Sequence, residues 1–279
     1  MQKKQSEDRM NRGMKMFASA MLVGSCLSAQ TVPKQDQLRK TATAGTCANE
    51  PLMEKRVEAM ETQLKDWPLL SRYAQEDTQF AGVADEQRVV FLGDSITDGW
   101  SNPQFGGFFP GKPYVNRGIG GQTTPQMLLR FRPDVIDLKP RVVVILAGTN
   151  DIAGNTGPMT LEQTEGNLAT MSELAHLHGI GVVLSSVMPV NDVTTPDGKK
   201  LVQTIERPPG KILALNAWIK MYAAEHGNVY LDYFSAMVDG QGMLKTDLTN
   251  DGLHPEAKGY AVMAPLAEKA IQEAMAKRP

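Results

Sequence analysis

Three residue types that together can perform nucleophilic catalysis, a serine, a histidine and an aspartate, occur in two short blocks of this sequence. Ser95 follows Gly93 and Asp94 directly after the apolar run Val89-Val-Phe-Leu92. Four consecutive apolar residues that include a β-branched pair predict a strand buried on both faces, as in a parallel sheet. Ser95 is then expected just beyond the carboxyl end of that strand, where open α/β sheets bind ligands. Ser95 is therefore a candidate nucleophile.

A serine hydroxyl reacts poorly until a base takes its proton, and that base must itself be held in place. The chain offers both groups in Asn250-Asp-Gly-Leu-His-Pro255, where Asp251 and His254 lie three residues apart. One turn can bring the Asp251 carboxylate to Nδ1 of His254 and leave Nε2 free for the serine. Each block alone is more typical of an ordinary turn or a helix cap, but the two together predict a Ser–His–Asp triad.

Two further polar blocks lie between these, Asn116-Arg-Gly-Ile-Gly-Gly-Gln-Thr123 and Ala147-Gly-Thr-Asn-Asp151. The four blocks, in this order over roughly residues 88–265, resemble the SGNH or GDSL-type esterase and acylhydrolase superfamily and its bacterial acetylhydrolase-like members. The resemblance implies a serine esterase on a flavodoxin-like fold that needs no metal and no cofactor.

The resemblance also implies a role for each matching residue. Ser95 would be the nucleophile, with Asp251 and His254 as the other triad members, and the oxyanion hole would be formed by Ser95, Gly121 and Asn150. The first block ends in isoleucine where the family's short name has leucine, an exchange that retains apolar bulk. No Gly-x-Ser-x-Gly elbow surrounds the serine, which argues against the α/β-hydrolase fold.

The loop after the nucleophile is dense in aromatic residues. Trp100, Phe105 and Phe108 are candidates to line the substrate site, since aromatic rings stack well on sugars, although simple packing is an equal alternative. We expect a short acyl ester, foremost acetyl, on a carbohydrate as substrate. The alternatives are a lysophospholipase or longer-chain lipase and, from another class, a catalytically silent carbohydrate-binding surface protein.

The remaining pattern alternates strands with helices. Apolar runs predict strands at 141–147, 181–187 and 229–232, and periodic segments predict helices at 160–178, 210–226 and 256–276. This alternation favours an α/β fold, a three-layer αβα sandwich with a central parallel sheet. The long excursion at 189–209 follows the carboxyl end of a strand, so we expect it to shape the substrate site.

The catalytic domain should span residues 50–279 and begin with a helical extension over about 50–80. Apolar residues recur there at intervals of three and four on both sides of Pro68, which predicts one helix, a kink and a second helix. The extension could pack over the outside of the sheet or, alternatively, cover the active site as a lid.

The amino terminus has the features of an export signal. A basic leader and a short apolar run ending in small residues predict a signal peptide over 1–29, and the polar stretch 30–49 is expected to be a disordered tether. Val23-Gly-Ser-Cys26 also resembles a lipobox, so Cys26 is a possible lipid anchor beside soluble export to the periplasm or the medium. Cys47 would then lack an intramolecular partner.

Charge and composition limit the partners of this 279-residue chain. The net charge of −2 and the pI near 6.1 give no electrostatic reason to expect nucleic acid as a ligand. His176 and His178 are expected in the last turn of a helix, where a cation complements the helix dipole. We therefore expect them to be structural residues.

Overall fold

The computed structural model describes residues 50–80 and 87–277. The chain divides into two units between Arg56 and Val57, and the sheet with the helices that cover it belongs to the second. The predicted export signal, the tether and both cysteines lie outside the described residues. No described helix combines the length and the apolar content that a membrane span requires.

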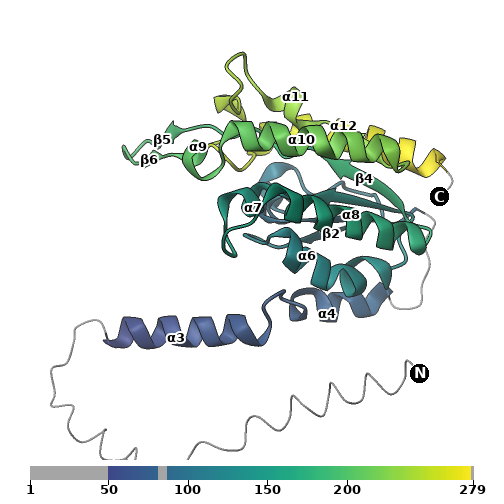
Figure 1. Ribbon diagram of the computed structural model, residues 1–279, viewed down its shortest axis with the longest axis horizontal. Helices are drawn as coiled ribbons and strands as arrows, with labels where there is room; N and C mark the ends of the chain where they lie inside the picture. Colours follow the sequence, from purple (N-terminus) through teal and green to yellow (C-terminus); the bar gives the residue numbers. More distant parts are fainter. Residues whose placement is uncertain (1–49, 81–86, 278–279) are drawn as a thin grey trace, which may run out of the picture. The chain divides into compact units, whose positions relative to one another are not determined.

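Five parallel strands form the central sheet, in the order β2-β1-β3-β4-β7 (Figure 1). Their bounds are β1 Val89–Gly93, β2 Tyr114–Gly118, β3 Val142–Leu146, β4 Gly181–Ser185 and β7 Val229–Leu231. From β1 the chain first adds β2 on one side and then β3 on the other, so the strand order reverses at β1. Such a switch point leaves a crevice at the carboxyl ends of the strands, which is where ligands bind in open α/β sheets.

Helices cover both faces of this sheet, as the alternation of strands and helices predicts (Figure 1). Three helices pack on one face and a fourth on the other. Their bounds are α6 Thr124–Phe131, α8 Leu161–Leu177 and α10 Pro209–Glu225 on the first face, and α12 Ala257–Ala276 on the second. The three-layer αβα sandwich is confirmed, and the three long helices end within one residue of their predicted bounds.

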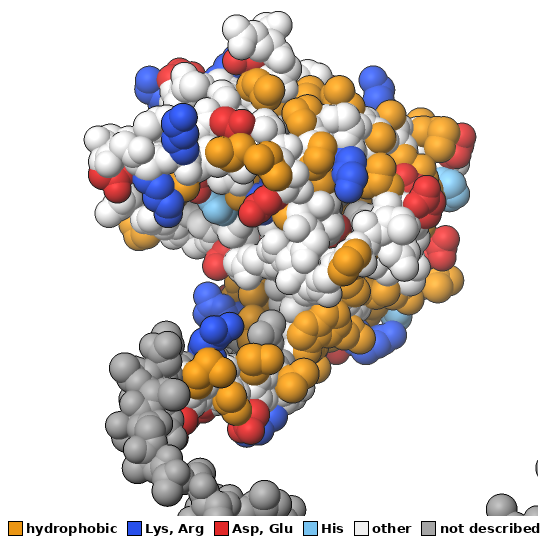
Figure 2. Space-filling model, turned by 60° about the vertical axis from the view of Figure 1, so that its left-hand side comes forward, with side chains coloured by type: hydrophobic (Ala, Val, Ile, Leu, Met, Phe, Trp, Pro, Cys, Tyr) orange, Lys and Arg blue, Asp and Glu red, His pale blue; other side chains and the backbone are white. Residues whose placement is uncertain are grey.

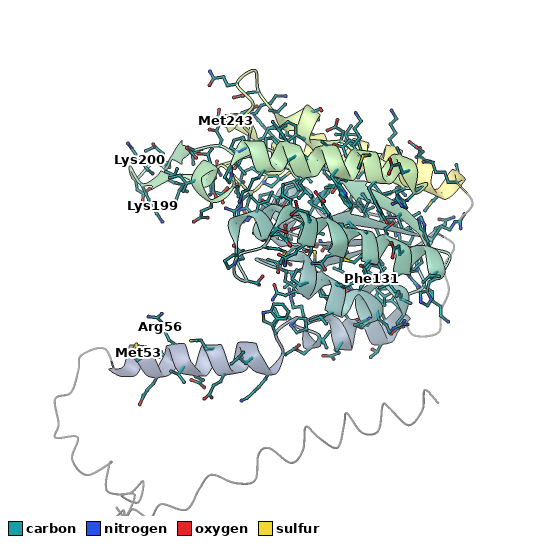
Figure 3. All side chains as sticks on the ribbon, viewed as in Figure 1. Met53, Arg56, Phe131, Lys199, Lys200 and Met243 are labelled. Carbon is teal, nitrogen blue, oxygen red and sulfur yellow. The ribbon has the colours of Figure 1, made fainter. Side chains whose placement is uncertain are left out.

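Shorter elements follow the carboxyl ends of the strands. They comprise the helices α5 Ser95–Gly99, α7 Thr149–Ala153, α9 Gln203–Glu206 and α11 Tyr233–Met237, and the hairpin of β5 Val193–Thr194 and β6 Lys200–Leu201. Lys199 and Lys200 mark the exposed end of this hairpin (Figure 3). The elements that position the candidate site residues are therefore short, and they are held by the sheet beneath them.

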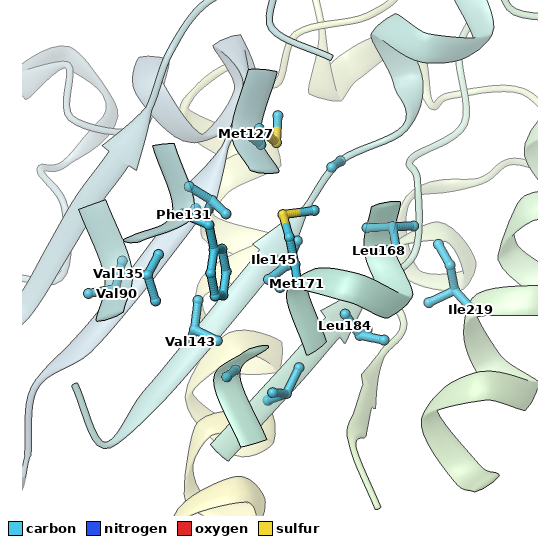
Figure 4. Packing of buried hydrophobic residues seen from close by; sticks show 14 of the residues in the cluster. Val90, Met127, Phe131, Val135, Val143, Ile145, Leu168, Met171, Leu184 and Ile219 are labelled. Atoms are coloured by element: carbon cyan, nitrogen blue, oxygen red, sulfur yellow. The ribbon is translucent and has the colours of Figure 1, made fainter. Parts of the chain in front are cut away.

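Successive residues of a strand place their side chains alternately in the core on one face of the sheet and in the core on the other. Val143 and Ile145 of β3 face α6, α8 and α10, while Val142 and Val144 face α12. On the first side Phe131, at the end of α6, lies among the strand side chains (Figures 3 and 4). This two-sided burial is the physical reason that β1 and β3 read as continuous apolar runs rather than as alternating ones.

The amino-terminal extension forms the two predicted helices, α3 Glu50–Lys65 and α4 Ser71–Asp77. Tyr73 of α4 is buried and donates to the Gly118 carbonyl, while the Arg117 guanidinium lies over the Tyr73 ring and pairs with Asp77. The helix α4 therefore covers the β2 end of the sheet.

The apolar residues of α3 do not share this burial. Val57, Met60 and Leu64 are all exposed, so the prediction that the extension packs over the sheet is wrong for α3. The spacing of three and four residues between the apolar side chains of α3 reflects one apolar helix face, which no other described residue covers.

Basic and acidic side chains are interspersed over the face of the molecule drawn in Figure 2, as expected of a chain with nearly balanced charge.

Substitution of Phe131 tests the packing of the core on the face of the sheet that α6 covers. We expect Phe131→Ala to lower the free energy of unfolding by about 3–5 kcal/mol, because its ring is completely buried and its removal leaves a cavity. The control is Leu129→Ala on the same helix, which should change stability by no more than about 0.5 kcal/mol since that side chain is 56% exposed. Urea unfolding at equilibrium measures both, and equal effects of the two variants would contradict this packing.

Candidate active site

The nucleophile candidate lies at the junction of β1 and α5. Ser95 is the first residue of α5, and the Asp94 side chain caps the helix by accepting from the Ile96 N–H at 2.9 Å. A Cβ on Gly93 would lie 2.1 Å from Oγ1 of Thr97, so only glycine lets the helix start this close to the strand. The tight junction leaves Ser95 half-buried at the carboxyl edge of the sheet.

A continuous hydrogen-bond chain links Ser95 to the carboxyl-terminal block. Ser95 Oγ lies 2.8 Å from His254 Nε2, and His254 Nδ1 lies 2.6 Å from Asp251 Oδ2. The second carboxylate oxygen, Oδ1, accepts from the backbone N–H groups of Leu253 and His254 at 2.9 and 2.8 Å. The carboxylate is thus fixed on both oxygens, and it holds the proton of a neutral imidazole on Nδ1 so that Nε2 faces the serine.

The loop that carries Asp251 and His254 is held by the excursion at 189–209. Gly252 has φ +80°, and a Cβ there would lie 1.9 Å from the carbonyl oxygen of Asn191. The Asn191 N–H donates to the Gly252 carbonyl at 2.8 Å, and Gln203 Nε2 donates to the Asp251 carbonyl at 3.0 Å. The excursion therefore holds the loop of Asp251 and His254 through backbone and side-chain hydrogen bonds. The sequence alone does not reveal these contacts.

The candidate oxyanion donors lie on the other side of Ser95. The Ile119 N–H donates to the Gly93 carbonyl at 3.0 Å, and a Cβ on Gly120 would lie 3.8 Å from the Cβ of Ser95. Gly121 follows with φ +77°, a left-handed conformation that favours glycine. The loop that carries Gly121 thus passes directly beside the serine.

Asn150 comes to the same edge from β3. It lies in the first turn of α7, is buried, and donates from Nδ2 to the Gln122 carbonyl at 3.0 Å. The structure therefore brings the two blocks with the candidate oxyanion donors together, as it brings together the blocks of the triad. One N–H of the Asn150 carboxamide is used by Gln122, which leaves the second for a ligand.

A fully buried arginine, which sequence reasoning missed, ties these segments to one another. Arg130 donates to the carbonyls of Gly93 and Arg117 at 2.9 and 2.8 Å and to Oε1 of Gln122 at 2.6 Å. Asp134 accepts from the same guanidinium at 2.7 Å. The one local signal is the i, i+4 spacing of Arg130 and Asp134, which is also typical of an exposed helix pair.

Asp94 adds a buried carboxylate close to the half-exposed triad. Burial raises its pKa to about 6, against the lowering effects of the Ile96 N–H and of His254. Its Oδ1 caps α5, while Oδ2 has no hydrogen-bond partner among the residues that the structure describes. Asp94 therefore contributes a negative potential near His254 that varies with pH.

The triad pair shifts the pKa values of both its members. The hydrogen bond to Asp251 raises the pKa of His254 by more than burial lowers it. Burial would raise the pKa of the Asp251 carboxyl, but its hydrogen bonds from His254 and Leu253 hold that pKa well below its usual range. The pair is thus arranged to stabilise a positive charge on the imidazole whenever it takes up a proton.

The aromatic loop packs into the core rather than forming an open wall. Trp100 is only 4% exposed and lies with its ring centroid 5.1 Å from that of Tyr260 in α12, which corrects its assignment to the substrate site. Phe105 packs on Tyr260 and Phe108 on Phe91, and both are half-buried. Contact of Phe105 and Phe108 with substrate stays a prediction.

His176 and His178 lie where the sequence places them, at the end of a helix. His176 lies in the last turn of α8 and His178 is its C-cap, and both are exposed. Within residues 50–80 and 87–277, no group of three or more His, Cys, Asp or Glu side chains is arranged to hold a metal ion.

Comparison with known proteins gives a consistent family. A GDSL-like lipase from Bacteroides thetaiotaomicron of known crystal structure is 42% identical, with a TM-score of 0.67, over 75% of this chain and 100% of that one. Esterase TesA of Pseudomonas aeruginosa is 30% identical over 143 residues, 50% of this chain and 60% of that protein. The uncharacterized lipoprotein YqeF of Bacillus subtilis is 39% identical over 79 residues, 27% of this chain and 32% of that protein.

The matches to TesA and YqeF span less than two thirds of either protein. The family match is longer, since it extends over residues 91–262, more than half of the chain, and includes Ser95, Asp251 and His254. With that match, and with the fold of the Bacteroides protein over its whole length, the chain belongs to the GDSL-like lipase/acylhydrolase family.

Proposed function

We propose that this protein is a serine esterase that hydrolyses carboxylic esters through an acyl-enzyme. The observation that carries the proposal is the hydrogen-bond chain from Ser95 Oγ through His254 to Asp251, with contacts of 2.8 and 2.6 Å. Family membership supports the same chemistry. A silent binding protein, the rival from another class, has no need of a carboxylate that orients His254 towards a serine.

The proposed reaction proceeds in two halves. Ser95 Oγ attacks the ester carbonyl carbon while His254 Nε2 takes the hydroxyl proton, and the negative charge that develops on the carbonyl oxygen is stabilised by donors from Ser95, Gly121 and Asn150. The carbon–oxygen bond to the alcohol then breaks, and His254 returns the proton to the departing alcohol. Water repeats the sequence on the acyl-serine, with His254 again as base, and releases the acid.

We propose a short acyl group, foremost acetyl, on a carbohydrate as the substrate class. The support is the resemblance of the blocks around Ser95 and Asn116 to acetylhydrolase-like members of the family. Phe105 and Phe108 remain the candidates for contact with a sugar ring. Export suits an extracellular carbohydrate ester, and the likeness to a lipoprotein supports an anchor at Cys26.

A longer-chain lipase or lysophospholipase is the alternative, and one observation favours it. Val202 and Ile205 are exposed apolar residues on either side of Gln203, which contacts the triad loop through the Asp251 carbonyl. Exposed apolar side chains so near the site could contact an acyl chain.

Two ester substrates separate these functions. We expect p-nitrophenyl acetate to be cleaved with a higher kcat/KM than p-nitrophenyl octanoate, because the proposed acyl site is short. The reverse order would favour the lipase alternative, with Val202→Ser and Ile205→Ser then lowering activity on octanoate alone. A protein that is folded but cleaves neither ester would support the silent binding protein.

Removal of the nucleophile tests the acyl-enzyme. Ser95→Ala should lower kcat by orders of magnitude, by about 10⁴-fold or more, because no other group can form the acyl intermediate. The variant should remain folded, since His254 is the only hydrogen-bond partner of the Ser95 hydroxyl among the residues that the structure describes. If circular dichroism shows a native fold and the variant keeps more than a tenth of the wild-type kcat, the nucleophile lies elsewhere.

The pH profile tests the base. His254 must be neutral to accept the proton and Asp251 raises its pKa, so kcat/KM should rise with pH through a limb that lies above the value of about 6.5 for a free imidazole. Asp251→Asn should move this limb to lower pH and cut the plateau by about 10⁴-fold, since an amide that donates to Nδ1 holds the wrong tautomer.

A matched control for Asp251→Asn is available nearby. Asp247 is exposed and pairs only loosely with Lys258 at 3.9 Å, so Asp247→Asn should leave the profile unchanged. A wild-type limb below about pH 5, or an Asp251→Asn plateau within about threefold of wild type, would remove the pair from the mechanism.

Asn150→Ala tests the oxyanion hole. We expect kcat to fall by about a hundredfold or more with little change in KM, because the carboxamide acts on the charged oxygen of the transition state rather than on the ground-state carbonyl. A lowered melting temperature with near-normal kcat in the folded fraction would instead assign Asn150 a structural role.

A further inference from the structure

The residue that follows α9, Arg207, contacts the side chain of a candidate oxyanion donor, Asn150. Arg207 is buried, with a side chain that is 6% exposed, and its Nη2 lies 3.4 Å from Oδ1 of Asn150. Its Nη1 donates to Oε1 of Gln203 at 3.0 Å, and Gln203 in turn donates to the Asp251 carbonyl. One short segment therefore contacts both the oxyanion side and the triad side of the site.

The contact with Arg207 decides which way the Asn150 carboxamide points. Nδ2 donates to the Gln122 carbonyl at 3.0 Å, and Oδ1 accepts from Arg207. A flipped amide would set Oδ1 against the Gln122 carbonyl and Nδ2 against a cation, so both contacts would become repulsive. Because the contacts with Gln122 and Arg207 fix the amide plane, the second N–H of Nδ2 can point in only one direction.

The surface ion pair of Arg207 does not explain its burial. Glu206 accepts from Nη1 at 3.1 Å, but the Glu206 side chain is 64% exposed, and such a pair contributes little. Removing a guanidinium from water is costly unless its donors are used, and the Arg207 Nε has no acceptor among the described residues. A buried cation that contacts a carboxamide oxygen polarises the amide and makes its N–H a better donor to a negative charge.

We propose that Arg207 is a positioning residue of the oxyanion hole: it holds the Asn150 carboxamide with Nδ2 towards the developing negative charge and strengthens that donor. The inference rests on the proposed function, since Asn150 needs this orientation only if it stabilises an oxyanion. Arg207 acts through Asn150 and need not contact the substrate.

A double-mutant cycle tests the coupling. Arg207→Met keeps the apolar stem but removes the charge and the donors, and it should lower kcat on p-nitrophenyl acetate about tenfold with KM little changed, less than the hundredfold expected for a lost donor. In an Asn150→Ala background the same change should have almost no further effect, because the group through which it acts is gone. Arg132→Met, at an exposed arginine 3.9 Å from Asp137, is the matched control and should behave as wild type in both backgrounds.

The pH profile gives a second readout that a merely structural residue would not move. The charged and titratable groups facing His254 are Asp251 on its own loop, Asp94 at the start of α5, and Arg207 after α9. Arg207 lowers the pKa of His254, so Arg207→Met should shift the acid limb of kcat/KM to higher pH. Arg207→Lys retains the charge and should keep the limb near its wild-type position while restoring only part of kcat.

The outcomes separate this inference from the function on which it rests. If Asn150→Ala keeps a near wild-type kcat, the oxyanion assignment fails and the role of Arg207 fails with it. If Asn150→Ala loses activity but Arg207→Met lowers kcat by the same factor in the wild-type and Asn150→Ala proteins, the proposed function stands and the inference is overturned. Should Arg207→Met fail to fold, Arg207→Lys is carried through the same cycle, and an additive loss there would also overturn the inference.

Discussion

The guanidinium of Arg130 gathers the chain segments on which the candidate site is built. It is fully buried and donates to the carbonyls of Gly93 and Arg117 and to the side chain of Gln122. Burial lowers the pKa of Arg130 and raises that of its partner Asp134, but the ion pair and the three further acceptors offset the cost of placing charge in the core. Removal of either partner would leave an unpaired buried charge. The hydrogen bonds of Arg130 hold the ends of β1 and β2 and the loop that carries Gly121 and Gln122 together.

The candidate site is built on that unit by elements that bring side chains to one edge of the sheet. Ser95 and Asn150 each lie in the first turn of a short helix that follows a strand, and His254 arrives on a loop that enters from the opposite end of the chain. Neither short helix has a hydrophobic face long enough to fix its own position. Their geometry therefore depends on close approaches, such as that of Gly93 to Thr97, and on hydrogen bonds to neighbouring loops.

The excursion between β4 and α10 supplies much of that support. Through Asn191 and Gln203 it holds the backbone of the triad loop, and through Arg207 it reaches the Asn150 carboxamide. The same excursion carries the exposed apolar residues Val202 and Ile205 and an exposed hairpin. One segment therefore contacts both the triad loop and the Asn150 carboxamide.

The sequence by itself determined the strands β1, β3, β4 and β7, the long helices α8, α10 and α12, and the triad candidates, because each depends on local patterns. Apolar runs identify strands buried on both faces, and a spacing of three residues lets Asp251 reach His254. Only the tertiary structure decided what spans the fold: the contact of Ser95 with His254, 159 positions away, the burial of Trp100, and the burial of Arg130 and Arg207. In sequence an arginine is expected at the surface, and its burial follows only from the acceptors that distant segments place around it. Local patterns fix the backbone of an element, whereas side-chain partners follow from how the elements pack.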